Sequence, residues 1–176
     1  ILGGMGPEAT AQLYLEIIRI LQKKYRARND ADFPEIVILN LPLLDVVKEL
    51  QDGVKEQLIY GVKKLEAAGV DFIVIPCNTV CYFIESLRKV VSIPIISLPE
   101  EVAKVVGELK LKKVGLLGTK ITLDTKLFDR SMPKVEIVSP TKNETEVITK
   151  IILEVLGGRK TIKSKAEIIR IIRKLE

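Results

Sequence analysis

The chain of 176 residues contains no histidine, no tryptophan and only two cysteines. Without histidine, a Ser-His-Asp triad, a Cys-His dyad and a His-ligated metal site are excluded within these residues. Two cysteines are too few for a four-sulfur zinc site or an iron–sulfur cluster. Acid–base chemistry would therefore depend on Cys, Lys, Tyr, Asp or Glu side chains.

Charge and hydrophobicity bear on the class of protein. Hydrophobic residues make up 47% and charged residues 29% of the chain, so it can bury a core. The net charge is +5, but the charges are interspersed and only 5% of residues are aromatic, which favours a solvated surface over a nucleic-acid partner. No apolar run reaches the roughly 20 residues that cross a membrane. Two cysteines without a disulfide framework indicate the cytoplasm, and the abundance of Ile, Lys and Glu resembles a thermophile's composition.

Short β-branched segments alternate with longer segments of helical period, which is typical of parallel sheets covered by helices. The pattern predicts strands at residues 1–2, 35–40, 71–76, 94–98, 113–117 and 134–138. It predicts helices at residues 7–27, 54–68, 79–90, 100–109, 144–156 and 164–175. The strand at 71–76 is the most apolar and is expected to be central. The first helix is expected to bury Ala9, Leu13, Leu15, Ile17, Ile20 and Leu21.

The predicted fold class is α/β, with two similar three-layer α/β/α lobes and mainly parallel sheets. Residues 1–98 would form the first lobe and residues 99–176 the second, which is expected to be incomplete at its C-terminus. Ligands of open α/β sheets bind at the carboxyl ends of strands. We therefore expect the active site in a cleft between the lobes.

Cys77 lies where the apolar strand ends, followed by Asn78 and Thr79, which are both residue types that cap helix N-termini. A helix N-terminus favours a thiolate and binds carboxylates. Such a site would suit a small carboxylic acid. The alternative is that Cys77 is a small buried hydrophobe. Cys81 forms C-x-x-x-C rather than the C-x-x-C of redox pairs, so we expect it to pack in the core.

Two further segments combine glycine with a strand end. The turn Gly3-Gly4-Met5-Gly6-Pro7 either exposes N–H groups to an anion or allows close helix packing, and it does not match the dinucleotide-binding or Walker spacing. Gly118-Thr119, with Thr122 beyond it, repeats the arrangement in the second half. Thr119 either binds a carboxylate or caps a helix.

Together these segments resemble the aspartate/glutamate racemase family, the pyridoxal-independent amino-acid racemases. Four stretches carry the resemblance: ILGGMGPEAT at residues 1–10, GVDFIVIPCNT at 69–79, VGLLGT at 114–119 and IILE at 151–154. The resemblance implies a homodimer with no cofactor and no metal, acting on a small amino acid or dicarboxylate. It also implies a mechanism in which one thiolate removes the α-proton and a second thiol on the opposite face delivers one.

Carried over by matching positions, Cys77 is the first catalytic cysteine, and Met5, Gly6, Asn78, Thr79 and Thr119 bind the substrate. The family's second cysteine lies in a Gly-Cys-Thr-Glu motif after the last helix, and this sequence ends at Glu176, so we expect that segment beyond the 176 residues. Cys81 lies on the same side as Cys77 and cannot replace it.

The residue that would bind a substrate's side-chain carboxylate is open. Aspartate-specific members carry an arginine after the second strand, where this chain has residues 42–47 without one and Lys48 nearby. Arg159, Lys160 and Lys163 are the other candidates. Two alternative functions also remain: a single-cysteine isomerase or decarboxylase of the same superfamily, and a non-catalytic binding protein with a racemase-like fold.

Overall fold

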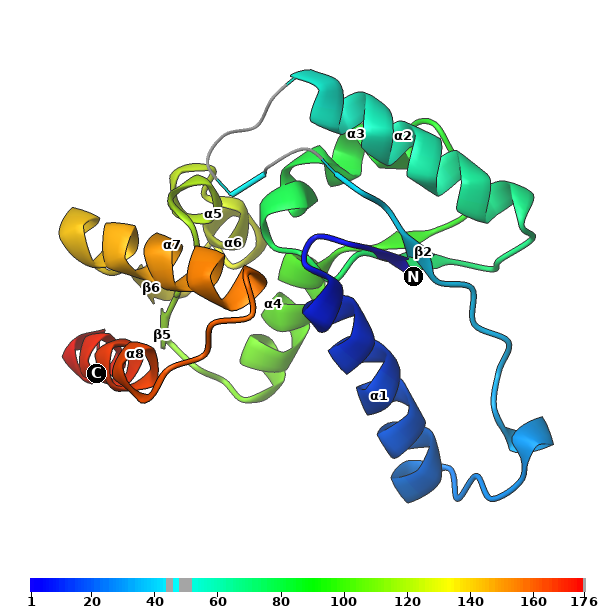
Figure 1. Cartoon of the computed structure of the whole chain (residues 1–176), viewed down its shortest axis with the longest axis horizontal. Coiled ribbons are helices and arrows are strands. Elements are labelled where there is room, and N and C mark those ends of the chain that lie inside the picture. Colours follow the sequence, from blue (N-terminus) through cyan, green and yellow to red (C-terminus); the bar gives the residue numbers. More distant parts are fainter. Residues whose placement is uncertain (44–45, 48–51, 176) are drawn as a thin grey trace. The chain divides into compact units, whose positions relative to one another are not determined.

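The computed structural model describes residues 1–43, 46–47 and 52–175 (Figure 1). Their mutual contacts divide the chain into two compact units. Unit 1 contains residues 1–43, 52–77 and 83–96, and unit 2 contains residues 46–47, 78–82 and 97–175. The chain thus passes from unit 1 to unit 2 at the peptide bond between Cys77 and Asn78. The division into domains at residue 98 stays a prediction.

Unit 1 contains two parallel strand pairs. Strand β1 (Leu2–Gly3) pairs with β2 (Leu39–Asn40), and β3 (Ile73–Val74) pairs with β4 (Ile95–Ile96). The helices of this part of the chain are α1 (Pro7–Lys24), α2 (Asp52–Ala67) and α3 (Ile84–Arg88), with the 3₁₀ helix η1 (Asp30–Asp32) between α1 and β2. The parallel pairing confirms the α/β class. Within the described residues β3 pairs only with β4, so its predicted central place in a sheet is not confirmed.

The core of unit 1 forms where α2 packs on β1. Val54, Leu58 and Val62 are each 0% exposed, and their spacing of four residues puts them on one face of α2. Gly61 lies on the same helix, where a Cβ atom would come within 2.6 Å of Leu2 Cδ1. The absence of a side chain at position 61 therefore allows α2 to lie close against β1.

Unit 2 contains one parallel pair, β5 (Lys113–Gly115) with β6 (Glu136–Val138). Its helices are α4 (Leu98–Glu108), α5 (Lys120–Asp124), α6 (Leu127–Ser131), α7 (Lys142–Leu156) and α8 (Ile162–Leu175). Val106, Phe128 and Met132 are buried together at its core, which joins α4 to α6. The sequence analysis did not predict the two short helices α5 and α6.

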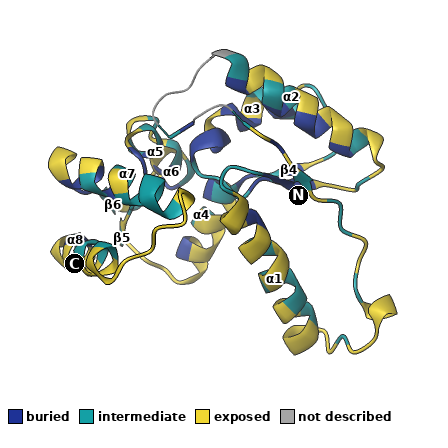
Figure 2. Cartoon of the chain, in the orientation of Figure 1, coloured by how far each residue is buried: buried dark blue, intermediate teal, exposed yellow. Residues whose placement is uncertain are grey.

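Two predictions about helices were wrong in part. The helix expected over 79–90 is a 3₁₀ helix, η2 (Thr79–Phe83), followed by the five residues of α3. In α1 only Thr10 is buried, while Leu15 and Ile20 are 47% and 51% exposed, although both were expected in the core. Figure 2 shows that most of α1 is exposed or partly exposed.

Candidate functional site

The glycine turn after β1 is held by backbone contacts. Gly4 has a φ of +102°, and a Cβ atom at this residue would lie 2.2 Å from the carbonyl oxygen of Leu41. The N–H of Gly4 donates to Oγ1 of Thr10 on α1 at 3.0 Å. This N–H is therefore used within the protein, and the close packing favours the structural interpretation at Gly4. Met5 and Gly6 follow it and are half-buried, so they keep some access to solvent.

Cys77 and Cys81 are both thiols, and they differ in exposure. Cys77 is half-buried, and its N–H donates to the carbonyl of Ile75 at 2.9 Å, which makes a tight turn around Pro76. Cys81 lies in η2 and is 5% exposed, as expected for a packing residue. Of the two thiols, Cys77 is the one that a ligand in solution can reach.

The segment after Cys77 begins as a 3₁₀ helix, whereas an α-helix was expected over residues 79–90. Residues 79–83 form a 3₁₀ helix in which the N–H of Cys81 donates to the carbonyl of Asn78 at 3.2 Å. The α-helix α3 follows η2 directly at Ile84, so residues 79–88 form a helical segment that begins as a 3₁₀ helix. The expectation that a helix N-terminus favours a Cys77 thiolate stays a prediction.

Three threonine hydroxyls meet in unit 2. Thr79 Oγ1 lies 3.3 Å from Thr119 Oγ1 and 3.4 Å from Thr122 Oγ1. The oxygens of Thr119 and Thr122 are 3.1 Å apart. Thr119 also caps α5, because its Oγ1 accepts from the N–H of Thr122 at 3.3 Å. The structure thus brings together two predicted site residues that are 40 positions apart in the sequence.

Thr122 was not among the predicted site residues. Its hydroxyl takes part in the cluster, and its side chain is 1% exposed. The available signal was the Gly-Thr-x-x-Thr spacing, which places two hydroxyls one helical turn apart at the start of α5. The spacing alone does not indicate that Thr122 contacts Thr79, which lies 43 positions away in the sequence.

The candidate basic residues lie around the start of α8. Arg159 and Lys160 precede α8 and Lys163 lies in its first turn, and all three are exposed. The N–H of Arg159 donates to the carbonyl of Glu154 at 2.8 Å. Lys48 lies outside the described residues.

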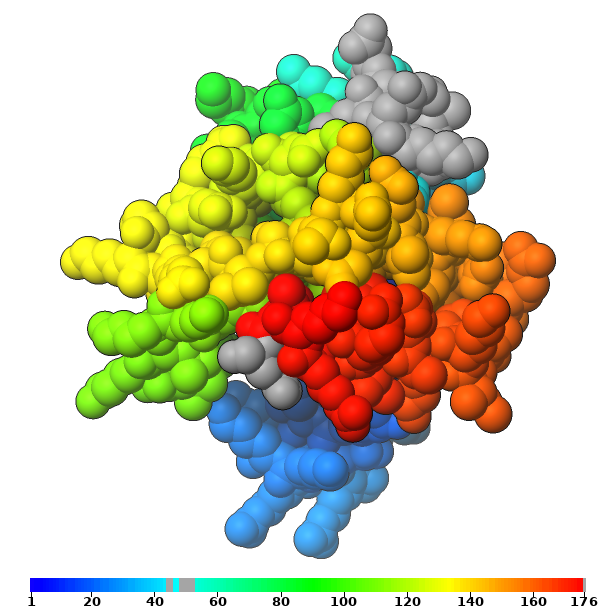
Figure 3. All heavy atoms as spheres, turned by 90° about the vertical axis from the view of Figure 1, so that its left-hand side faces the viewer, coloured from blue at the N-terminus to red at the C-terminus, as the bar shows by residue number. Residues whose placement is uncertain are grey.

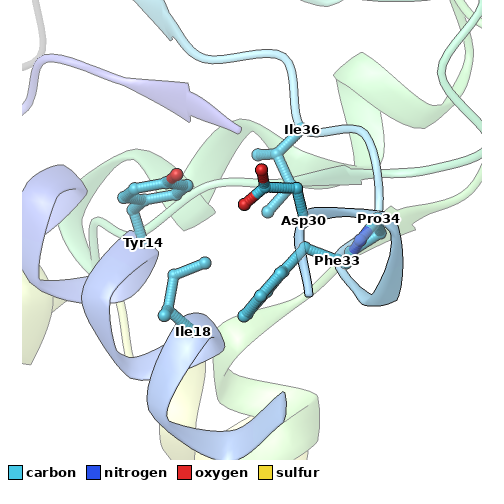
Figure 4. A pocket seen from close by; sticks show the side chains of 6 residues that line it. All are labelled: Tyr14, Ile18, Asp30, Phe33, Pro34 and Ile36. Carbon is cyan, nitrogen blue, oxygen red and sulfur yellow. The ribbon is translucent and has the colours of Figure 1, made fainter. Parts of the chain in front are cut away.

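Unit 1 has a cavity of about 400 Å³ between α1 and the segment that follows η1. Figure 4 shows Tyr14 and Ile18 on α1 near Phe33 and Ile36, with the Asp30 carboxylate among them. Its lining contains neither Cys77 nor a predicted substrate-binding residue.

Unit 2 has a larger cavity of about 850 Å³ beside α5 and α7. Its lining includes Lys120, Lys126 and Lys142 together with Asp124 and Glu146. Neither this cavity nor the one in unit 1 includes a residue of the predicted site. The predicted site residues therefore lie outside both cavities, in the glycine turn and the Cys77 turn of unit 1 and in the threonine cluster of unit 2.

Residues 1–43, 46–47 and 52–175 contain neither a candidate metal site nor a candidate membrane span. In these residues, no three His, Cys, Asp or Glu side chains come together as a metal would require. The helices in these same ranges are too short or too polar to cross a bilayer.

The chain was compared with known proteins. A family model described as Asp/Glu/Hydantoin racemase matches residues 2–176. The broad specificity amino-acid racemase RacX of Bacillus subtilis is 35% identical over 132 residues, which are 74% of this chain and 58% of RacX. A glutamate racemase of Aquifex pyrophilus is 33% identical over 70 residues, 39% of this chain and 28% of that protein. The chain thus spans less than two thirds of the length of these relatives.

Solved structures show the same fold. The aspartate racemase of Picrophilus torridus superposes with a TM-score of 0.81 at 24% identity, covering 98% of this chain and 73% of that one. An aspartate racemase homologue from Pyrococcus horikoshii gives a TM-score of 0.75 at 29% identity, covering 98% of this chain and 76% of that one. The predicted α/β fold is confirmed by these similarities.

Proposed function

The chain belongs to the Asp/Glu/hydantoin racemase family, and on that premise we propose that it acts as a pyridoxal-independent amino-acid racemase with Cys77 as one of two acid/base thiols. The observation that carries the proposal is that Cys77 is half-buried whereas Cys81 is buried. Cys77 also precedes Thr79, a member of the hydroxyl cluster, by two residues in the sequence. Racemisation needs an acid and a base on opposite faces of the α-carbon, each within hydrogen-bond reach. Cys77 lies three residues after the end of β3 and is half-buried, and we propose that it serves on one face.

We assign Asn78, Thr79 and Thr119 to the substrate carboxylate. Removal of the α-proton shifts negative charge onto that carboxylate, so donors aimed at its oxygens stabilise the transition state. The threonine hydroxyls supply such donors, and Met5 and Gly6 are proposed as further substrate-binding residues. The cluster holds its three hydroxyl oxygens within 3.1–3.4 Å of one another.

The second thiol is not assigned to this sequence. Cys81 is 5% exposed and follows Cys77 by four residues, so it cannot approach the opposite face of a substrate bound at Cys77. We propose, as the family resemblance implies, that the second thiol belongs to a segment outside these 176 residues. The proposed assembly is a homodimer without cofactor, in the cytoplasm.

The proposed substrate is a small amino acid of the aspartate or glutamate class. Arg159, Lys160 and Lys163 are exposed cations that could bind a side-chain carboxylate. RacX is named for broad specificity, so a test must include neutral and basic amino acids beside the acidic ones.

The decisive experiment uses the protein together with the segment proposed to carry the second thiol. It follows α-proton exchange in D₂O by NMR and enantiomer ratio by chiral chromatography, for both enantiomers of each amino acid. We expect exchange and racemisation of at least one amino acid, with Cys77→Ser lowering kcat/KM by roughly 10²–10⁴-fold because one proton-transfer group is lost. Cys81→Ser is the matched control. It should change kcat/KM by less than about threefold, because a buried thiol is not accessible to the substrate.

Other results would contradict the proposal in distinct ways. Exchange of one enantiomer without racemisation would identify a single-cysteine isomerase or decarboxylase. Binding without exchange would identify a binding protein. Equal activity of wild type and Cys77→Ser would show that Cys77 is not the acid/base group.

A further inference from the structure

We propose that Thr122 is a positioning residue that directs the hydroxyl protons of Thr79 and Thr119 toward the substrate carboxylate. This inference rests on the proposed function and adds a residue to it. Thr122 is 1% exposed, against 5% each for Thr79 and Thr119, so it is the least accessible of the three. Its effect on a ligand must therefore pass through its two neighbours.

The geometry lets Thr122 donate to both neighbours at once. Its N–H donates to Thr119 Oγ1 at 3.3 Å, and its own hydroxyl lies 3.1 Å from Thr119 Oγ1 and 3.4 Å from Thr79 Oγ1. A threonine hydroxyl has one proton to donate and two lone pairs that accept. When Thr122 donates to both oxygens, the protons of Thr79 and Thr119 stay available for the two oxygens of a carboxylate. A hydroxyl that accepts a hydrogen bond is also polarised into a stronger donor.

Loss of the Thr122 hydroxyl would change this arrangement. Without it, Thr79 has Thr119 Oγ1, 3.3 Å away, as its remaining neighbour in the cluster. A buried hydroxyl that loses one partner turns to the next available one. Thr79 would then donate to Thr119, and one proton rather than two would remain for the ligand.

Thr79 depends on unit 2 for its placement. It lies in residues 78–82, which group with unit 2, whereas Cys77 groups with unit 1. Its hydroxyl lies within hydrogen-bond distance of Thr119 and Thr122, both near the start of α5. The cluster therefore fixes the first hydroxyl after the catalytic thiol, and Thr122 is its innermost member.

The test compares Thr122→Val, which keeps the side-chain shape, with Thr122→Ser, which keeps the hydroxyl. With the amino acid that wild type racemises fastest, we expect Thr122→Val to raise KM about tenfold, the equivalent of one lost hydrogen bond, with kcat changed less. Thr122→Ser should restore KM to within about twofold of wild type. Thr149→Val is the matched control, because the Thr149 hydroxyl of α7 donates to the carbonyl of Thr145 at 2.9 Å rather than to a residue of the cluster.

Thermal unfolding of each variant separates positioning from general damage. A Thr122→Val protein with wild-type KM overturns the inference, as does a Thr122→Ser protein that is as defective as Thr122→Val. Should Thr122→Val not fold, Thr122→Ala replaces it in the same comparison with Thr122→Ser.

The same variants separate this inference from the proposed function. If wild type binds aspartate or succinate by calorimetry but exchanges no α-proton, the racemase proposal fails, and the tenfold weakening of binding in Thr122→Val decides the role of Thr122. If wild type binds neither compound and exchanges no amino acid, both proposals are wrong.

Discussion

Lys174 of α8 donates a hydrogen bond from Nζ to Glu144 Oε1 of α7 at 2.6 Å, across 30 positions of sequence. The other oxygen of Glu144 accepts from the N–H of Thr141 at 3.1 Å and from its hydroxyl at 2.8 Å. One carboxylate thus completes the capping box at the start of α7 and holds the last helix against it. Figure 3 shows α8, in red, beside α7, in orange.

We predict that Glu144→Gln lowers the free energy of unfolding, because a neutral amide loses the charge-assisted bond to Lys174. The Glu144 side chain is 9% exposed and the Lys174 side chain 55% exposed, so water replaces only part of what is lost. Urea unfolding at neutral pH measures the change. The control is Glu146→Gln, which removes an exposed carboxylate two residues along the same helix and should leave stability nearly unchanged.

Acid should abolish the contribution of Glu144. The hydrogen bonds from Lys174 and Thr141 lower the pKa of this carboxyl from 4.5 to about 2 in the folded protein. A carboxyl whose pKa is depressed by folding stabilises the protein above its unfolded pKa and loses this contribution as pH falls through the folded value. The stability difference between wild type and Glu144→Gln should therefore be constant above pH 4.5 and shrink as the pH approaches 2.

The charged groups that face Glu144 come from α8 as well as α7. Glu167 and Arg170 of α8 pair with each other and act on the same region as Lys174. The Glu144 charge raises the pKa of Glu167, so Glu144→Gln also changes the titration of Glu167, and this effect accompanies the titration of Glu144 in the difference between the two proteins. A stability difference that stays constant down to pH 2 would show that the ion pair with Lys174 does not lower the pKa of Glu144.

The sequence predicted the alternation of strands and helices because, along the chain, at least one helix lies between the two strands of each parallel pair. β5 and β6, for example, lie within the two predicted strands at 113–117 and 134–138.

The predicted buried face of α1 was wrong for a geometric reason. Leu13 and Leu15 are two residues apart, which is about 200° around a helix, so one stripe cannot hold both. Leu13 is half-buried and Leu15 is exposed.

Residues 79–90 show how tertiary contacts override a helical pattern. Val80, Cys81, Tyr82 and Phe83 have weak helix propensity, so local preference for a helix is small. The hydroxyl contacts of Thr79 with Thr119 and Thr122 then fix the start of this segment. A contact across some 40 positions leaves no periodic signal, which is why the sequence predicted Thr79 and Thr119 separately and did not predict Thr122 as a site residue.

The glycine turn offers the last prediction. Gly4→Ala should lower the free energy of unfolding by about 1–3 kcal/mol, because alanine at a φ of +102° is strained. The added methyl group would also come within 2.2 Å of the Leu41 carbonyl oxygen, so the backbone after β2 would have to move. Urea unfolding gives the change in stability, and amide hydrogen exchange at Leu41, whose N–H donates to Gly3 at 3.0 Å, reports the displacement.

Gly107→Ala is the control, and it should change the free energy of unfolding in the opposite direction. Gly107 lies in α4, is exposed, and has no atom within 4 Å of the position that a Cβ would occupy. Alanine there should raise stability by about 0.5–1 kcal/mol, since glycine loses more backbone entropy in a helix. If both substitutions destabilise equally, removal of glycine itself is the cause. If only Gly4→Ala destabilises, the turn geometry is responsible, and the placement of Met5 and Gly6 depends on it.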